Sequence, residues 1–288
     1  QQALEERLIA RYPGISWQRS EVIGKQIADL LERKSGFTLG HDASRFDSSV
    51  LRDIVRVIFD CIGVLFNEPV VFKWIERYFS EAPILIPDGS GGSNLTLKGR
   101  KKGVPSGSPF TALVDSLVNL ALSALVQSDV PIDVLFEAVL VLGDDKVEHT
   151  EGLDGVTLAL RYLRYNISLK RVWQCNNVTG EITIFVRDGD WGSRTYKAVA
   201  KFVADRKCVE YISRLWYVDG KYHTSGFRVI NNTLRLERFK RDWRPIDDLG
   251  ATMQRVEHLT WHPGLIAVCR VLYRHRAWMS VNYVVRYA

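Results

Sequence analysis

Apolar residues recur at helical spacing in several parts of this chain. Helices are predicted over 21–34, 48–66 and 68–80, from about 109 onward, near 156–166, and over most of the chain from about 195. Shorter apolar runs predict strands at 36–44, 169–174 and 182–187, and turn residues between paired runs predict hairpins over 82–99 and 134–150. The pattern therefore predicts a mixed α/β fold.

The second of these hairpins carries two adjacent aspartates at its tip. Gly143 supplies the turn, and Asp144 and Asp145 follow it directly. Side chains alternate between the two faces of a strand, so both carboxylates need a turn to lie together. A surface turn is one interpretation, because Gly and Asp are common turn residues. A cation held by the two carboxylates is the other.

Composition is that of a folded protein with a sizeable core. The chain has 288 residues, of which 46% are hydrophobic and 25% are charged. It contains no apolar run of about 18 residues, and its first residues lack a signal-peptide pattern, so we expect no membrane segment. The four cysteines are far apart and form no CxxC pair, which favours a reducing, intracellular setting.

Charge is distributed unevenly along the sequence. Residues 1–160 carry 16 Lys and Arg against 22 Asp and Glu, a net charge of −6. Residues 161–245 carry 18 against 8, a net charge of +10. Clustered positive charge attracts polyanions, so the second segment is a candidate polyanion-binding surface. A solvated basic face has the same pattern.

Two further aspartates lie where a strand is followed by a helix. Asp42 is near the end of the strand over 36–44, and Asp47 comes five residues later, at the start of the next helix. If this strand pairs with the hairpin, Asp42 converges with Asp144 and Asp145. Such a group of carboxylates repels itself unless divalent cations neutralise it, and hard oxygen ligands suit Mg²⁺. Two ions about 3.5–4 Å apart are a standard arrangement for phosphoryl transfer.

A third stretch, GVPSGSPFTALVDSLVNL over 103–120, combines a loop with the start of a helix. Ser106 and Gly107 lie in the loop, where backbone amides can approach a ligand, and a helix N-terminus favours phosphate oxygens. Thr111, Asp115 and Asn119 recur every fourth residue and would line one face of the helix. Such a stripe indicates a polar partner opposite the helix, although Thr and Asp that reach solvent would give the same spacing.

Together the three stretches resemble the palm of viral RNA-dependent RNA polymerases. DASRFD is similar to motif A, PSGSPFT with a later Asn to motif B, and LGDD to motif C, in the family's order. The form GVPSGSxFTxxxDSxxN looks most like the polymerases of partitiviruses and picobirnaviruses, which are small double-stranded RNA viruses. The resemblance implies an α+β fold, a right-hand palm whose antiparallel sheet is flanked by helices, with a helical thumb.

The resemblance also implies a role for each matching residue. Asp42, Asp144 and Asp145 would bind two Mg²⁺ or Mn²⁺ ions, and Asp47 would sense the ribose 2′-hydroxyl of the incoming nucleotide. The remaining nucleotide-binding candidates are Ser106, Gly107, Thr111, Asp115 and Asn119. Many relatives have Asn at the position of Asp115, so here two facing carboxylates would need a shared proton or a bridging cation.

The later part of the chain supplies further implied roles. Lys170 would be the general acid that protonates the pyrophosphate, although its spacing departs from that of the family. Residues 183–191 would form a hairpin that grips the primer end, and the basic segment 161–245 would hold the phosphates of the product. The implied partners are an RNA template, the RNA product and NTPs.

The implied domains are an N-terminal helical segment over 1–35, a palm over 36–190 with a fingers insertion around 67–103, and a thumb over 191–288. Polymerases of this family carry basic fingers residues well upstream of motif A, whereas 41 residues precede Asp42 here. We therefore expect another chain or a further segment to supply most of the fingers. Such an enzyme would work in the host cytoplasm or inside the virion.

Other functions fit the sequence less well. A reverse transcriptase usually has an aromatic and a variable residue before its paired aspartates, so LGDD argues against it. A P-loop hydrolase would need GxxxxGK followed by Ser or Thr, which GRKKGVPSGS does not supply. The alternative that stays open is a non-catalytic, palm-like scaffold that binds RNA during replication. That protein would be expected to lose a metal-binding aspartate, and all three are present.

Overall fold

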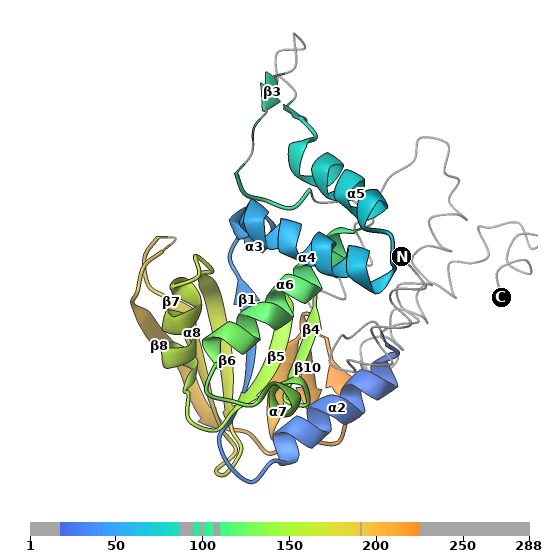
Figure 1. Ribbon diagram of the computed structural model, residues 1–288. Coiled ribbons are helices and arrows are strands. Elements are labelled where there is room, and N and C mark those ends of the chain that lie inside the picture. The colour runs from blue at the N-terminus through green and yellow to red at the C-terminus, as the bar shows by residue number, and fades with distance from the viewer. Residues whose placement is uncertain are drawn as a thin grey trace, which may run out of the picture. The chain divides into compact units, whose positions relative to one another are not determined.

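The computed structural model describes residues 18–86, 95–97, 99, 101–105, 110–190 and 192–224 (Figure 1). Of these, Ser213–Trp216 and 221–224 belong to a second compact unit, and the others belong to the first. Within the described part of the chain, no helix combines the length and the apolar content needed to span a membrane.

A six-stranded antiparallel sheet forms the centre of the first unit. In spatial order its strands are β4 (Val139–Leu142), β5 (Asp145–Thr150), β1 (Phe37–Ala43), β6 (Leu169–Asn176), β7 (Glu181–Arg187) and β8 (Tyr196–Val203). The earliest strand in the sequence, β1, lies between two much later ones: Phe37 pairs with Thr150 of β5 on one side and with Asn176 of β6 on the other. The expected antiparallel sheet is confirmed.

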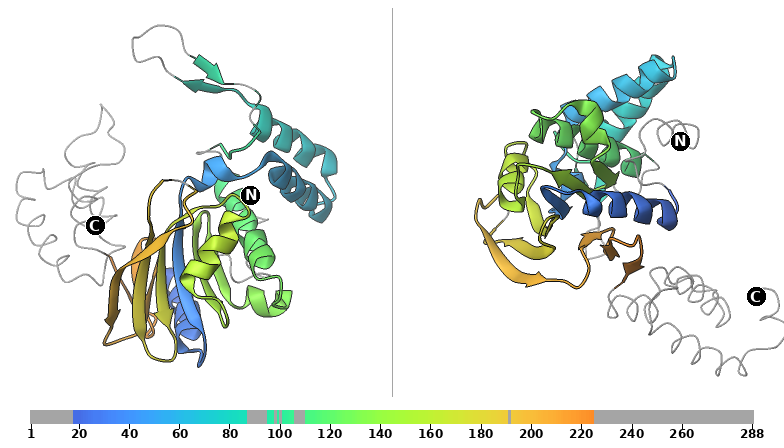
Figure 2. Two further views of the ribbon diagram at one scale, coloured as in Figure 1. Left: turned by 90° about the vertical axis from the view of Figure 1, so that its left-hand side faces the viewer. Right: turned by 90° about the horizontal axis from the view of Figure 1, so that it is seen from below.

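Helices cover one face of this sheet (Figures 1 and 2). Helix α6 (Thr111–Val126) packs on β4, and α8 (Gly155–Leu163) packs on β6 and on α6. Their apolar side chains meet those of the strands in one buried core, whose central members are Leu39, Leu113, Val118, Val141, Leu158 and Val172. The catalytic candidates of the sequence analysis lie around one end of this helix and sheet sandwich.

On the opposite face, β9 (Cys208–Tyr211) packs on β1, and α2 (Ser20–Glu32) packs on β5. The Thr38 hydroxyl donates a hydrogen bond to the carbonyl oxygen of Leu30 in α2, at 3.1 Å. At Gly40, β9 approaches so closely that a Cβ atom would lie 2.0 Å from the carbonyl oxygen of Glu210. Glycine is therefore required in the middle of β1, where a side chain would displace β9.

The helix predicted over 48–66 is interrupted at its start. It forms α3 (Phe46–Ser49) and α4 (Arg52–Leu65), separated by extended backbone at Val50 and Leu51. The Gly103 N–H donates to the carbonyl oxygen of Val50 at 2.8 Å, and the Arg52 N–H donates to that of Lys101 at 3.2 Å. These tertiary hydrogen bonds use backbone N–H and C=O groups that would be paired within the helix if it were continuous. No local sequence pattern predicts them.

A helical hairpin and a small strand pair follow. Helix α5 (Pro69–Glu81) packs against α4, and Pro69 stands at its first position, where a missing N–H has no cost. Strands β2 (Ile84–Ile86) and β3 (Leu95–Leu97) then pair antiparallel, so the hairpin predicted over 82–99 is confirmed. Residues 87–94 between them lie outside the described residues.

Two other predicted elements differ from the structure. The strand expected over 134–142 is confined to β4, because Ile132–Phe136 forms the short helix α7 after Pro131. The helices expected from about 195 are wrong over 196–223, where β8, β9, β10 (Arg214–Tyr217) and β11 (Tyr222–His223) lie. Pairing with β7 along its whole length decides the conformation of β8, and β10 pairs with β11. The helices expected beyond residue 224, including one over 265–285, fall on residues that the structure does not describe.

Candidate active site

The turn between β4 and β5 has Gly143 and Asp144 as its two residues. Leu142 and Asp145 are the last Cα partners of the hairpin, and Gly143 has a φ of +61°. A positive φ at the first position of a two-residue turn favours glycine and matches the twist of the strands. Asp144 is therefore at the exposed tip, as predicted, whereas Asp145 is the first residue of β5 and is half-buried.

The predicted pairing of the Asp42 strand with this hairpin is confirmed. β1 pairs with β5 up to the partners His41 and Lys146, and one step further along that register lie Asp42 and Asp145. Since side chains alternate between faces, Asp42 and Asp145 are on the face opposite His41. The structure thus brings the motif A strand beside the motif C turn.

Four aspartates from three segments of the chain interact electrostatically, and we call Asp42, Asp47, Asp115 and Asp144 the acidic cluster. Although Asp144 is exposed at the tip, neighbouring atoms partly desolvate its carboxylate and raise its pKa, and the carboxylates of Asp47 and Asp42 raise it further. Burial also raises the pKa of Asp115, and with the charges of Asp47 and Asp144 and a hydrogen bond to Asp47 it reaches about 8. Asp115 is therefore protonated at neutral pH, which supports the expected shared proton with Asp47.

The position of Asp115 follows from how α6 is held against the turn. The Gly143 N–H donates to Ser116 Oγ at 2.8 Å. Asn119 Nδ2 donates to the carbonyl oxygens of Gly143 and Asp144, at 3.1 and 3.2 Å. The polar stripe predicted on this helix thus has a polar partner opposite it, the backbone of the turn. Asn119, expected to bind the nucleotide, holds this backbone in the structure.

Ser116 was not among the predicted site residues. Serine in an apolar helix commonly bonds to the preceding turn of its own helix, and Ser116 also does this, donating to the carbonyl oxygen of Ala112 at 2.6 Å. Its second partner, the Gly143 amide, comes from a distant segment. No spacing within the helix could have indicated that contact.

The loop before α6 is tied to the motif A segment. The Val104 N–H donates to the carbonyl oxygen of Asp47 at 2.6 Å, and Thr111 Oγ1 donates to the carbonyl oxygen of Pro105, also at 2.6 Å. Thr111, another predicted nucleotide-binding residue, therefore fixes the start of the loop. Ser106 and Gly107 lie outside the described residues.

Lys170 lies in β6, where the register with β1 shifts between Asp42 and Ala43, and its side chain is exposed. Its neighbour Arg171 is the direct cross-strand partner of Asp42. Arg171 also forms an ion pair of 2.5 Å with Glu210 of β9. Sequence reasoning missed Arg171 because only the strand pairing shows which residue of β6 stands beside Asp42.

A buried polar network lies on the helix-covered face beneath the turn, and its charged members are Lys146 and Glu148. Each of these two side chains is at most 1% exposed. Glu148 accepts hydrogen bonds from Gln127 Nε2 at 2.7 Å and from the Tyr162 hydroxyl at 2.9 Å, and its Oε1 lies 2.6 Å from His41 Nε2. Lys146 and Glu148 are two residues apart on one strand, so their side chains lie on the same face. This spacing was the feature of the sequence that could have indicated their proximity.

Charge in this network is balanced within the protein. Burial lowers the pKa of Lys146 to about 8, against the opposing effect of Glu148. Burial raises the pKa of Glu148, but Lys146 and His41 lower it by more, to about 2. Burial also lowers the pKa of His41, which leaves its ring neutral at pH 7. Lys146 and Glu148 therefore carry the two opposite charges of the network, and the Tyr162 hydroxyl lies between them as a partner of both.

The acidic cluster has the donor atoms of a metal site but not the arrangement of a complete one. Among the described residues, no three His, Cys, Asp or Glu side chains are arranged to share one ion. The donor chemistry nevertheless suits a hard cation, because all donors are carboxylate oxygens. The Oδ1 atom of Asp115 is buried without a hydrogen-bond partner, and Asp42 and Asp47 both raise the pKa of Asp144. A divalent cation would relieve this repulsion.

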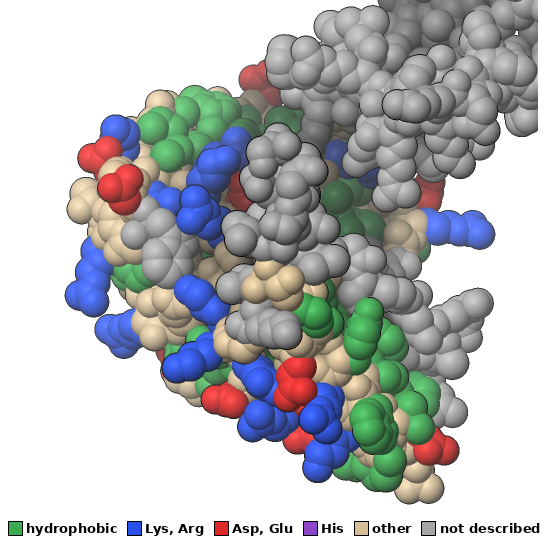
Figure 3. Space-filling model, turned by 90° about the horizontal axis from the view of Figure 1, so that it is seen from above, with side chains coloured by type: hydrophobic (Ala, Val, Ile, Leu, Met, Phe, Trp, Pro, Cys, Tyr) green, Lys and Arg blue, Asp and Glu red, His purple; other side chains and the backbone are tan. Residues whose placement is uncertain are grey.

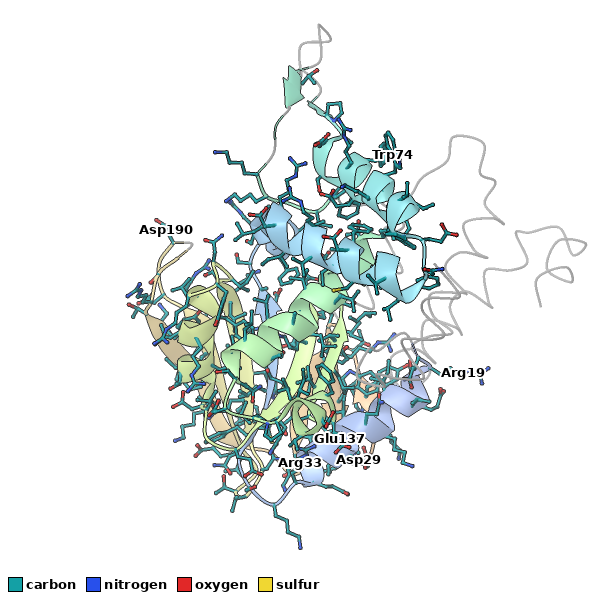
Figure 4. The ribbon with its side chains drawn as sticks, viewed as in Figure 1. Arg19, Asp29, Arg33, Trp74, Glu137 and Asp190 are labelled. Atoms are coloured by element: carbon teal, nitrogen blue, oxygen red, sulfur yellow. The ribbon has the colours of Figure 1, made fainter. Side chains whose placement is uncertain are left out.

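The surface around the site carries mixed charge and some apolar area. Lys and Arg side chains gather on the face shown in Figure 3, together with a smaller number of Asp and Glu. In the basic segment, several cations have acidic partners: Lys197 with Asp188, Lys201 with Glu181, and Arg206 with Asp219. On α5, Trp74 projects into solvent with 67% of its surface exposed (Figure 4).

Comparison with known proteins finds a matching family model and solved structures of similar fold. Residues 11–151 match the family model of viral RNA-dependent RNA polymerases. An insertion-loop deletion mutant of a human picobirnavirus RNA-dependent RNA polymerase matches with a TM-score of 0.64 and 18% identity, over 89% of this chain and 46% of that chain. The undeleted polymerase of a human picobirnavirus matches with a TM-score of 0.64 and 16% identity, over 89% and 45%. No curated protein matches the sequence. The chain thus spans less than half the length of these polymerases.

Proposed function

We propose that this chain, whose resemblance to viral RNA-dependent RNA polymerases is confirmed in sequence and in fold, catalyses template-directed RNA synthesis as the palm-containing part of such an enzyme. The acidic cluster carries the proposal. It assembles carboxylates from motifs A, B and C around one turn, and α6 holds the backbone of that turn through Ser116 and Asn119. A simple surface turn would need no such support.

Asp42 and Asp144, with Asp145 beside them, are the residues that would hold two Mg²⁺ or Mn²⁺ ions. Bound ions of this kind favour ionisation of the attacking 3′-hydroxyl and neutralise charge on the NTP phosphates. The chain itself contributes a rigid support. Asp42 is fixed by pairing of β1 on both sides, and Asp144 is fixed by the two-residue turn.

Selection of the sugar would rest on Asp47 and Asp115. With the proton that its high pKa retains, Asp115 can donate a hydrogen bond to Asp47. Asp47 would then keep its remaining acceptor positions for the ribose 2′-hydroxyl. Protonated Asp115 would thus act as the Asn of many relatives does, because both present a donor to Asp47. Thr111 would act through the loop that carries Ser106 and Gly107, which would approach the nucleotide.

Groups on β6 to β8 would act on the pyrophosphate and the RNA. Lys170 is the proposed general acid, and the exposure of its side chain leaves it free to reach a ligand. The β7–β8 hairpin, which includes residues 183–191, would grip the primer end. The basic segment 161–245 would hold product phosphates with those cations that no acidic neighbour neutralises.

The proposed partners are an RNA template, the RNA product and NTPs. The fingers would come mostly from a further segment or another chain, because the matching polymerases are about twice as long. The domains would be those predicted, a helical segment over 1–35, a palm over 36–190 with a fingers insertion around 67–103, and a thumb over 191–288. The chain would work in the host cytoplasm or the virion interior, where the cysteines at 61, 175 and 208, free in the structure, would stay reduced.

The test is incorporation of labelled NTPs on an RNA template with Mg²⁺ or Mn²⁺, by this chain and by a longer chain extended upstream. Asp144→Ala is expected to abolish incorporation. The matched control is Asp53→Ala, which removes an exposed carboxylate on α4, outside the acidic cluster, and should leave incorporation unchanged. Template binding without incorporation by either chain under several metal conditions would instead favour the palm-like scaffold.

A further inference from the structure

We infer that Lys146 is a positioning residue, which fixes the turn of Gly143 and Asp144 through helix α6. That this turn is part of a catalytic site rests on the proposed function, whereas the hydrogen bonds that fix the turn do not. Lys146 follows the paired aspartates directly in the sequence, but its side chain points to the opposite face of β5 and is 1% exposed. A lysine buried beneath a catalytic turn cannot contact substrate, so any role must act through its neighbours.

The ammonium group of Lys146 donates all three of its hydrogen bonds to groups on two helices. Its Nζ donates to the backbone oxygen of Asn119 at 3.0 Å and to Ser123 Oγ at 2.8 Å, both on α6. It also donates to the hydroxyl of Tyr162 on α8, at 2.5 Å. Three acceptors satisfy the three donors of an ammonium group, so the position of Nζ is determined. Strand β5 is thereby tied to both helices at one point.

Asn119 links Lys146 to the turn, and we call the hydrogen bonds that run from Lys146 through Asn119 to Gly143 and Asp144 the circuit. Its backbone oxygen accepts from Lys146, while its side-chain amide donates to the carbonyl oxygens of Gly143 and Asp144. A shift of α6 along β5 would therefore move the turn as well. The same helix carries Asp115, whose carboxyl group interacts with Asp47 and Asp144. The circuit thus sets how the motif C turn stands against motifs A and B.

Stability alone does not account for a buried pair of this kind. Replacing a buried ion pair with uncharged side chains is often neutral for stability, whereas removing one partner strongly destabilises the fold. The Glu148 carboxylate has partners of its own in Gln127, Tyr162 and His41. Of the two charged residues, only Lys146 donates a hydrogen bond to Asn119, the residue that holds the turn. This asymmetry separates a positioning role from mere charge balance.

The test compares Lys146→Met, Glu148→Gln and the double variant with wild type, in this chain. The single Lys146→Met variant leaves the buried charge of Glu148 without its opposite charge and is expected to lower the melting temperature by about 10 °C. The double variant should recover most of that loss. The second readout is hydrogen exchange of the Gly143 amide, which Ser116 protects, measured by NMR on ¹⁵N-glycine-labelled protein.

We expect the Gly143 amide of the double variant to exchange about tenfold faster than that of wild type, because the circuit is broken although stability is regained. Val172→Ala is the matched control, since it removes buried apolar atoms from β6 and makes none of the hydrogen bonds of the circuit. The double variant and this control are compared under conditions in which their melting temperatures are equal. If the Gly143 amide then exchanges no faster in the double variant than in the control, the inference is overturned. RNA synthesis is not measured here, so a failure of the proposed function would show separately.

Discussion

The proton on Asp115 makes a quantitative prediction for Asp115→Asn. The carboxyl group is 3% exposed, and its pKa rises from an ordinary 3.8 to about 8 in the folded chain. Between these values the folded state holds a proton that the unfolded state has released. The unfolded state then binds fewer protons, so the free energy of unfolding falls as the pH rises through this window. Asn titrates nowhere in the window and avoids this loss.

The expected size follows from the width of the window. Each pH unit between the two pKa values corresponds to about 1.4 kcal/mol. Between pH 5 and pH 8, wild type should therefore lose about 3–4 kcal/mol more stability than Asp115→Asn. Asp144, whose pKa is also raised, changes stability in the same direction in both proteins.

The assay is urea unfolding of both proteins at pH 5, 6, 7 and 8, in EDTA so that no cation neutralises the carboxylates. The free energies of unfolding should diverge steadily in favour of the variant as the pH rises. Asp115→Glu is a useful control, because it keeps a titrating group at the same place. Parallel pH dependences for wild type and Asp115→Asn would refute the reasoning, since Asp115 would then carry no proton in the folded state.

Three substitutions test the support of the site. Asn119→Ala leaves the carbonyl oxygens of Gly143 and Asp144 without their donor and should cost about 1–3 kcal/mol by chemical unfolding, with a larger fractional loss in RNA synthesis. Gly40→Ala should destabilise the fold more than a surface substitution does, since its Cβ would lie 2.0 Å from the Glu210 carbonyl oxygen; an unchanged melting temperature would contradict this packing. Gly143→Ala meets no atom within 4 Å and should cost only about 1 kcal/mol for its positive φ, so a loss of several kcal/mol would indicate contacts that the structure lacks.

Local patterns were sufficient for the parts of the fold that rest on local interactions. The hairpin at Gly143 was predictable because glycine in a two-residue turn between apolar runs is a short-range signal. The facing of Asp47 and Asp115 was predictable from the three motifs, which left a shared proton and a bridging cation as alternatives; the burial of Asp115 favours the proton. Functional motifs made of residues close together in the sequence could thus be recognised without the structure.

Features that depend on contacts between distant segments could not be predicted. The break at Val50 and Leu51 is caused by the chain around Gly103, and the strand β8 is formed by its pairing with β7. The sequence around Lys146 does not indicate that its side chain is buried, yet α6 and α8 bury it. In each case a tertiary partner overrides the preference of the local sequence, so a single sequence does not contain a readable signal.

The central place of β1 in the sheet has a consequence for how the protein folds. Phe37 must find Thr150 on one side and Asn176 on the other, so both ladders close long loops before they gain any stability. Folds dominated by such non-local pairings form slowly. We therefore expect the carboxylates to meet late, after β6 has been synthesised and docked. Until then, nascent chains would lack the assembled acidic cluster.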